Sequence, residues 1–410
     1  MAKRRGAERI RGSERKHLAD LALKHRRRGA LATVVEEGRD EHKLELWRER
    51  DERVQRALSY EPVDKVPFAF AGAAFAPISQ DVPFSHFCTD ADTAIEVTLD
   101  CMDELGDVDA TCMTASGLLP CHLTNLWLSP VHLPGHELPA HSLWQEQDSA
   151  DMSVEDYEII LSDGWEAFLA YFMPKVHNLE LLERHDKWMA ENLDDAPRRY
   201  HERGYATLAS VAATIPFEAL CGARSMAEFV LDLYRMPDRV KAALDSALPW
   251  CVERAIELTG ICGAKCCSIV AGRGASAMVP PRIWDEFVFP YIVDMVNELH
   301  AGGIFCLLHL DGDWSRDLHR FRELPRRSCA LAFDGSTDLR AAKNELGDHV
   351  AFLGDVPASL LARGTPDDVH GYVTALIRDI GPSGLIMSAG CEIPHDAPAE
   401  NVKAMVSAAG

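Results

Sequence analysis

The 410-residue sequence lacks long apolar runs, although 47% of its residues are hydrophobic. A membrane-spanning helix needs about 20 consecutive apolar residues, so we predict no contact with a membrane. The chain opens with M-A-K-R-R and has no apolar segment directly behind it, so we predict no secretory signal either. We therefore expect a soluble, cytoplasmic protein with enough apolar side chains for a large core.

Positive charge is scarce beyond residue 28. Residues 1–28 hold 11 Lys/Arg and 3 Asp/Glu, whereas the whole chain has a formal net charge of −22. The remainder is therefore strongly acidic and would repel nucleic-acid phosphates, so we expect no nucleic-acid partner. We interpret residues 1–46 as a basic helical arm and residues 47–410 as the folded domain.

The twelve cysteines lack the even spacing of a disulfide framework, and we expect reduced thiols. Cys262, Cys266 and Cys267 are spaced like part of a metal clip. Because the last two begin an apolar run, buried core thiols are the favoured interpretation.

Two common catalytic motifs are also missing. Neither a G-x-x-x-x-G-K-[ST] loop nor a G-x-S-x-G elbow occurs, which removes the usual signatures of phosphoryl and acyl transfer. Residues 272–277 fit G-x-G-x-x-A, but Pro280 and Pro281 follow closely. These prolines prevent the helix N-terminus that would receive a pyrophosphate, so we do not expect a nucleotide site there.

What the sequence does contain is an alternation of short β-rich apolar runs with longer helical stretches. We predict eight strands, at residues 66–71, 108–113, 206–211, 266–271, 304–309, 329–334, 350–354 and 385–389. This alternation is typical of an α/β fold, and eight strands predict a single (β/α)8 TIM barrel. The arm adds an N-terminal helical extension. Residues 118–202 form a long insertion before strand three, and we expect part of it to cover the active site.

The ends of predicted strands five and eight carry side chains that bind metals. His309 and Asp311 are two residues apart as strand five ends, so both face the same side. Cys391 follows strand eight at the same rim of the barrel. Nitrogen, oxygen and sulfur ligands with an open fourth position suit Zn²⁺, although with 17 His and 12 Cys a chance combination stays an alternative.

Other residues after strand ends are candidates for substrate contact or catalysis. The candidate substrate-binding residues are Phe70, Phe75, Trp314 and Glu218. Glu218 either completes the metal or substrate shell or is an acid in the first turn of a helix. Asp334 follows strand six and is either a catalytic carboxylate or a cap of the next turn.

Several segments resemble the uroporphyrinogen decarboxylase superfamily, particularly its corrinoid-dependent methyltransferase branch. They are R-V-Q-R-A-L at 53–58, E-P-V-D-K-V-P at 61–67, G-D-V-P at 354–357 and G-C-E-I-P at 390–394. In those methyltransferases a His-x-Cys pair after one strand and a Cys after the last strand bind Zn²⁺. The resemblance implies that His309 and Cys391 bind the metal here, with Asp311 in place of the middle Cys. Uroporphyrinogen decarboxylases carry an Arg-rich segment after strand one, whereas residues 70–75 contain no Arg, which disfavours a polyacidic tetrapyrrole.

The resemblance implies a TIM-barrel methyltransferase over residues 47–410. The residues that we expect to be catalytic are His309, Asp311 and Asp334. We expect it to move a methyl group from a small methoxylated compound, preferably aromatic, to a corrinoid carried by a separate protein. Zn²⁺ and the corrinoid are the implied cofactors. Two alternatives stay open: a metal-free lyase that resembles the decarboxylases, and methyl transfer from a corrinoid protein to a thiol. A homodimer also stays open as the oligomeric state.

Overall fold

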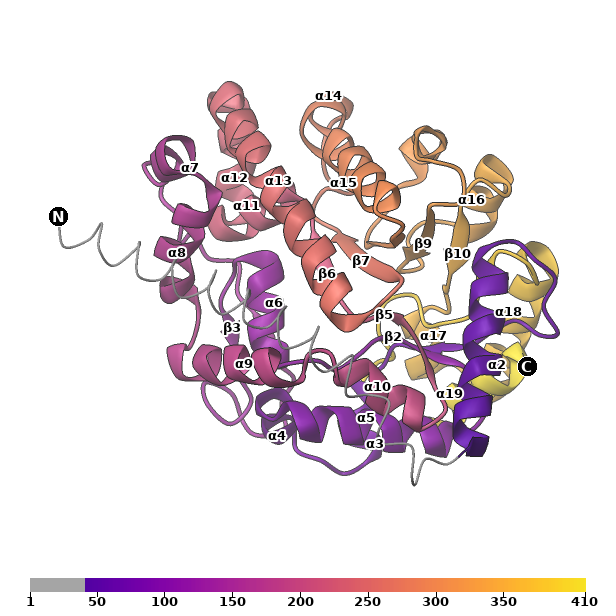
Figure 1. Ribbon diagram of the computed structural model, residues 1–410. Coiled ribbons are helices and arrows are strands. Elements are labelled where there is room, and N and C mark those ends of the chain that lie inside the picture. Colours follow the sequence, from indigo (N-terminus) through magenta and orange to yellow (C-terminus); the bar gives the residue numbers. More distant parts are fainter. Residues whose placement is uncertain (1–40) are drawn as a thin grey trace.

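A computed structural model describes residues 41–410, in which strands and helices alternate along the chain (Figure 1). One parallel sheet contains β1 (Ala69–Phe70), β2 (Ala110–Met113) and β5 (Ala206–Ala209). A second parallel sheet contains β6 (Ala212–Thr214), β7 (Cys266–Ala271), β8 (Phe305–Leu310), β9 (Cys329–Phe333), β10 (Ala351–Leu353) and β11 (Leu385–Ile386).

These two sheets are parts of one ring. β5 and β6 are consecutive pieces of a single strand, separated only by residues 210–211. At the other junction, the N–H of Ala69 donates to the carbonyl of Met387 and the N–H of Met387 donates to the carbonyl of Pro67, both at 2.8 Å. This junction brings the first and last barrel strands together, and the helix α2 (Glu41–Leu58) contacts β11 beside it. The predicted (β/α)8 TIM barrel is confirmed, and each of its eight predicted strands is found within residues 41–410.

Helices connect the strands and cover the outside of the ring. They are α2 (Glu41–Leu58), α3 (Phe75–Ser79), α4 (Phe84–Thr89), α5 (Ala91–Leu105), α6 (Leu119–Trp127), α7 (Tyr157–Asp163), α8 (Trp165–Val176), α9 (Leu179–Asn192), α10 (Ala196–Glu202), α11 (Pro216–Arg224), α12 (Met226–Arg235), α13 (Pro237–Cys262), α14 (Pro281–Ile283), α15 (Phe289–Ala301), α16 (Leu339–Leu346), α17 (Ala358–Arg363), α18 (Pro366–Ile380) and α19 (Ala399–Ala409), with the π-helical turn η1 (Trp284–Val288) and the 3-10 segment η2 (Ser315–Glu323). Local sequence sets several of their starts. Thr365 and Asp368, for example, form a reciprocal capping box at the start of α18.

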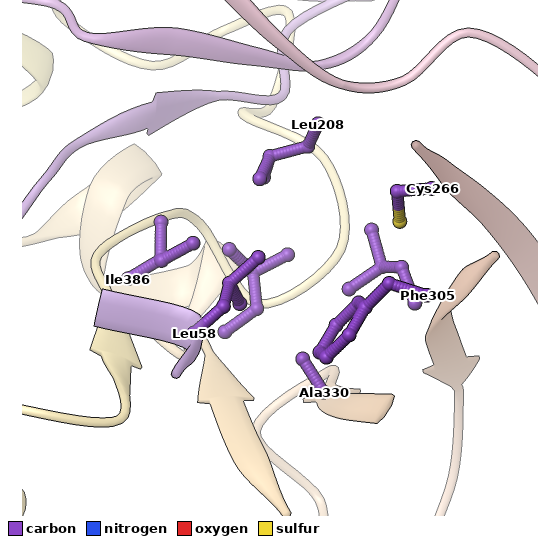
Figure 2. Close-up of a pocket in the computed structure, with 8 residues that line it drawn as sticks. Leu58, Leu208, Cys266, Phe305, Ala330 and Ile386 are labelled. Carbon is purple, nitrogen blue, oxygen red and sulfur yellow. The ribbon is translucent and has the colours of Figure 1, made fainter. Parts of the chain in front are cut away.

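The interior of the barrel is filled by small and apolar side chains. Alanines from five strands line it: Ala69, Ala110, Ala206, Ala330, Ala332 and Ala351. Helix α2 closes the end where the strands begin, since Val54, Ala57 and Leu58 are buried against this interior. A cavity of about 10 Å³ remains there, lined by residues that include Leu58, Leu208 and Phe305 (Figure 2). It has the volume of about one water molecule and its lining is apolar, so the barrel is a packed core and ligands must bind at its mouth.

The long insertion before the third barrel strand is present at residues 114–205. It contains helices α6 to α10 and a short antiparallel hairpin of β3 (Val131–His132) and β4 (Gln145–Glu146). Residues 1–40 of the predicted basic arm lie outside the described part of the chain. Helix α2 runs without a break across the predicted boundary between residues 46 and 47. None of the described helices is both long enough and apolar enough to cross a membrane.

The cysteines are free thiols, and eleven of the twelve are buried. Cys262, Cys266 and Cys267 lie in the core, as predicted. Cys391 alone is partly exposed, so among the twelve thiols it is the one that solvent reaches, at the end of strand eight.

Candidate metal centre at the barrel mouth

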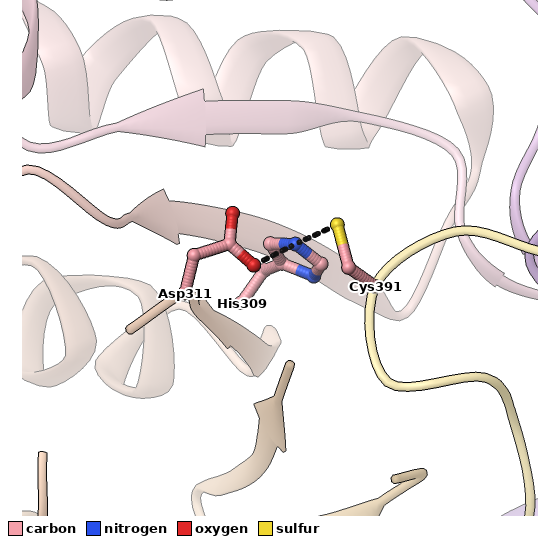
Figure 3. A group of neighbouring side chains, drawn as sticks. All are labelled: His309, Asp311 and Cys391. Atoms are coloured by element: carbon pink, nitrogen blue, oxygen red, sulfur yellow. Dashed lines mark hydrogen bonds and ion pairs between the residues drawn. The ribbon is translucent and has the colours of Figure 1, made fainter. Parts of the chain in front are cut away.

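The three predicted metal ligands come together where the strands end (Figure 3). His309 is the fifth residue of β8, Asp311 follows that strand directly, and Cys391 lies in the loop after β11. The Nε2 atom of His309 is 3.2 Å from Oδ1 of Asp311 and 3.4 Å from Sγ of Cys391. One donor atom from each residue lies within 4.8 Å of the other two, and Oδ1 of Asp311 is shielded from solvent beside His309. These donors fit a divalent metal ion.

Electrostatics couples the three side chains. Burial tends to lower the pKa of His309, but Asp311 and Cys391 raise it well above its usual value. Burial raises the pKa of the Cys391 thiol, partly against the effect of His309. Burial also tends to raise the pKa of Asp311, yet the neighbouring His309 holds it below its usual value. A proton on His309 is thus held between two acceptors, and a bound divalent cation would replace that proton.

Glu218 lies in the first turn of α11 and is fully buried, but the structure does not bring it to the three ligands. Its Oε1 accepts hydrogen bonds from the N–H groups of Gly272 at 3.0 Å and Gly274 at 2.9 Å. Its Oε2 accepts from the N–H of Arg273 at 3.1 Å. The carboxylate therefore fixes the loop that follows β7, and metal or substrate contact by Glu218 stays a prediction.

The loop at residues 272–274 connects Glu218 to the metal centre. A Cβ atom placed on Gly272 would lie 3.2 Å from Cβ of Asp311, which is tighter than an ordinary van der Waals contact, so a side chain here would press against the metal ligand. The G-x-G sequence thus serves close packing of this loop against the metal ligand.

The same loop is fastened to the insertion through Arg273. Its guanidinium forms an ion pair with Glu146 of β4. Its Cζ atom also lies 4.8 Å from the ring centroid of Trp127 in α6. The insertion is thereby attached to the barrel beside the metal centre.

Asp334 connects two further loops of the mouth. Its Oδ2 accepts the N–H of Gly312 at 2.9 Å, and its Oδ1 accepts the N–H of Ser336 at 2.8 Å. A Cβ atom on Gly390, the residue before Cys391, would lie 2.9 Å from the carbonyl carbon of Asp334. Asp334 therefore has the geometry of a turn cap that positions its neighbours, and its catalytic role stays a prediction.

The three predicted aromatic contacts lie in the core. Phe70 and Phe75 are 1% and 3% exposed, and Trp314 is completely buried. The indole N–H of Trp314 donates to the carbonyl of Asp311 at 3.0 Å, and its ring packs edge-on against Trp284. Trp314 thus fixes the backbone of a metal ligand, while contact of these aromatic residues with substrate stays a prediction.

One acid of the site, Glu392, was not predicted from the sequence. This residue follows Cys391, and its Oε2 is shielded from solvent with no hydrogen-bond partner. Burial raises the pKa of Glu392 to about 7, although the nearby N–H groups of Ala73 and Ala74 act to lower it. Two features of the sequence could have indicated this residue: it is an acid next to a predicted metal ligand, and the segment at 70–75 offers it no basic partner.

Comparisons with known proteins agree with this architecture. The family model described as uroporphyrinogen decarboxylase (URO-D) matches residues 176–410. Uroporphyrinogen decarboxylase 1, chloroplastic, from Oryza sativa subsp. japonica is 24% identical over 145 residues, which are 34% of this chain and 34% of that protein. That match therefore spans about a third of the relative's length.

The fold is similar to that of a solved methyltransferase from Methanosarcina mazei. The TM-score is 0.67 at 17% sequence identity, and the alignment covers 88% of this chain and 97% of that chain. The family match includes more than half of the present chain and contains the segments at 354–357 and 390–394 from which the resemblance was predicted. The chain belongs to the uroporphyrinogen decarboxylase family.

Proposed function

We propose that this protein is a metal-assisted methyltransferase, which takes a methyl group from a small methoxylated compound, preferably aromatic, and passes it to a corrinoid protein. The observation that carries the proposal is the grouping of His309, Asp311 and Cys391 at the mouth of the barrel. The likeness of this barrel to a solved methyltransferase supports it.

A Zn²⁺ ion held by these three side chains would supply Lewis acidity to the methyl donor. Asp311 stands where the family's methyltransferases have a thiolate, and a carboxylate leaves more positive charge on the metal, which favours an oxygen-bearing donor. Trp314 and the Gly272 loop hold Asp311 in place. Such support keeps the ligand geometry fixed during the reaction.

The proposed transfer is balanced in atoms and electrons. The bond between the methyl carbon and oxygen breaks, and its electron pair stays on the oxygen, which then takes a proton from solvent. The methyl carbon forms a new bond to Co(I), which supplies the electron pair. The proposal assigns the corrinoid to a separate protein.

The segment after strand one supports a methyl donor over a polyacidic tetrapyrrole. Residues 70–75 carry no basic side chain, and the nearby mouth contributes the carboxyl groups of Asp311 and Glu392. Several substrate carboxylates would therefore find no basic side chain in this segment to pair with.

Metal analysis and a transfer assay test the proposal. The purified full chain should bind one Zn²⁺ per molecule, and His309→Ala and Cys391→Ala should lose it, whereas the exposed control His300→Ala should retain it. Loss of the Co(I) absorbance of a corrinoid protein, in the presence of 2-methoxyphenol, should require the metal.

Three outcomes would overturn the proposed function. They are a chain without stoichiometric metal in which His309→Ala keeps full activity, a lyase activity that persists in chelator without any corrinoid protein, and methyl transfer that runs only from a methylated corrinoid protein to a thiol.

A further inference from the structure

We infer that Trp127 and Met113 bind the ring of the methyl donor, on an apolar wall beside His309. The preferred donor is then an uncharged aromatic compound, and an aliphatic methyl ether of similar size binds less tightly. This inference rests on the proposed function and adds to it the residues that select the substrate.

The register of the barrel strands places this wall next to the metal centre. His309 of β8 is the direct partner of Val270 of β7, and partners on parallel strands direct their side chains to the same face of the sheet. Val270 and Ala212 of β6 belong to one apolar cluster and are 7% and 8% exposed. Neither lines the closed cavity inside the ring, so their exposed surface lies at the mouth.

Two larger apolar side chains extend the wall. Met113 is the last residue of β2, and Trp127 is the last residue of α6, the first helix of the insertion. Both pack against the cluster that contains Val270, and both remain partly exposed. Met113 also packs against the alanine-rich interior of the barrel. The barrel and the insertion thus contribute jointly to an apolar surface that adjoins His309 through Val270.

Trp127 is held in place by the loop that supports Asp311. The Cζ atom of Arg273 lies 4.8 Å from the centroid of the indole ring, and the guanidinium is held by its ion pair with Glu146. The carbonyl of Trp127 also approaches α11 so closely that a Cβ atom on Gly222 would lie 1.7 Å from it. The indole is therefore fixed before a ligand arrives, which lowers the entropic cost of binding.

The chemistry of the wall favours an aromatic ligand. Aromatic rings attract one another in edge-to-face or offset arrangements beyond the effect of burial alone, and a thioether sulfur makes favourable contacts with ring edges. The wall offers no charged or hydrogen-bonding side chain of its own, so a charged group would lose its hydration there without compensation. An uncharged aromatic ring is the ligand that fits this surface.

Calorimetric titration of the Zn²⁺-loaded full chain tests this inference with two probes, 2-methoxyphenol and 2-methoxycyclohexanol. The probes carry the same substituents, and the ring of the first is aromatic. The wild-type chain should bind 2-methoxyphenol about tenfold more tightly, which is the combined effect expected from one indole contact and one thioether contact.

Three variants and a control isolate the two side chains. Trp127→Leu keeps the wall apolar and removes the indole, so the preference should fall to about twofold, whereas Trp127→Phe should retain most of it. Met113→Leu preserves the volume and removes the sulfur, so the preference should fall to about fivefold. This variant carries the test where a Trp127 variant does not fold. The control Tyr234→Leu, which changes an aromatic residue that is 62% exposed on α12, should leave both affinities unchanged.

The results separate this inference from the proposed function. Equal affinities of the wild-type chain for the two probes, or a preference that persists unchanged in Trp127→Leu or Met113→Leu, would overturn the inference alone. A preference lost equally in Trp127→Leu and Trp127→Phe would also overturn it, because the indole would then act through the fold of its surroundings.

A wild-type chain without bound metal would instead remove the proposed function. Titration of that metal-free chain would still report the ring preference, since the metal ligands His309, Asp311 and Cys391 are not part of the wall. A Zn²⁺-loaded chain that binds neither probe would overturn both.

Discussion

Replacing Glu218 with Gln removes a negative charge from a point where three backbone N–H groups converge. Two of them donate to Oε1, at 3.0 and 2.9 Å, and the third donates to Oε2 at 3.1 Å. The oxygen of a Gln side chain can keep the first two bonds, whereas its amide group would face the N–H of Arg273 as a second donor.

The size of the effect follows from this count. One buried donor without an acceptor costs about 1–3 kcal/mol, and the two remaining bonds lose their charge-assisted strength. Relief from burying a charge offsets part of that loss. The ion pair with Arg273 adds little, because its atoms are 4.0 Å apart and Arg273 keeps Glu146 as a partner. We expect the free energy of unfolding to fall by about 2–4 kcal/mol.

Thermal and urea unfolding of Glu218→Gln measure this loss, and metal content is measured on the same samples. Glu180→Gln is the matched control, since Glu180 is an exposed acid in the first turn of α9 and its loss should cost less than about 1 kcal/mol. Zn²⁺ should stay bound in both variants. Unchanged stability together with lost metal would refute the reasoning, because Glu218 would then hold the ion and not the loop.

Two further predictions concern the metal centre and the response to acid. Gly272→Ala places a methyl group 3.2 Å from Cβ of Asp311 and should weaken Zn²⁺ binding about tenfold in a competition titration. The control Gly371→Ala, whose methyl group lies in open space on α18, should leave the Zn²⁺ affinity unchanged. Equal Zn²⁺ affinity in both variants would show that the loop does not position Asp311. Burial lowers the pKa of His185 to about 3, below its value of about 6.5 in an unfolded chain, so the native state binds fewer protons and its stability should fall as pH drops below about 6.5. Urea midpoints between pH 7 and pH 4 should show a shallower decline for His185→Gln than for the exposed control His136→Gln, and parallel curves would count against this source of acid sensitivity.

The fold was predictable because buried parallel strands appear in a sequence as short apolar runs between longer helical segments. The same rule located His309 and Asp311, since residues two apart at a strand end face one side, and it located Cys391, since parallel strands end at one rim. The interruption of the third barrel strand at residues 210–211 left no comparable signal.

The roles of individual acids were less accessible to sequence. Glu218 finds its N–H partners 54 to 56 residues further along the chain, a contact that no local pattern encodes. Glu392 was passed over because a free carboxylate oxygen is a property of the folded surroundings. For Trp314, an aromatic residue after a strand has the same sequence appearance whether it packs inward or lines a pocket, so its burial in the core could not be predicted.

The filled barrel interior limits how substrate and product reach and leave the metal centre. Within residues 41–410, α2 closes one end of the barrel, and the cavity inside the ring is apolar and water-sized, so this interior offers no passage to the metal ligands. Under the proposed function, the methyl donor, the released phenol and the cobalt of the partner protein all use the same opening. A docked corrinoid protein would therefore shut the donor in, and each turnover would require the two proteins to separate before the phenol departs and the next donor enters.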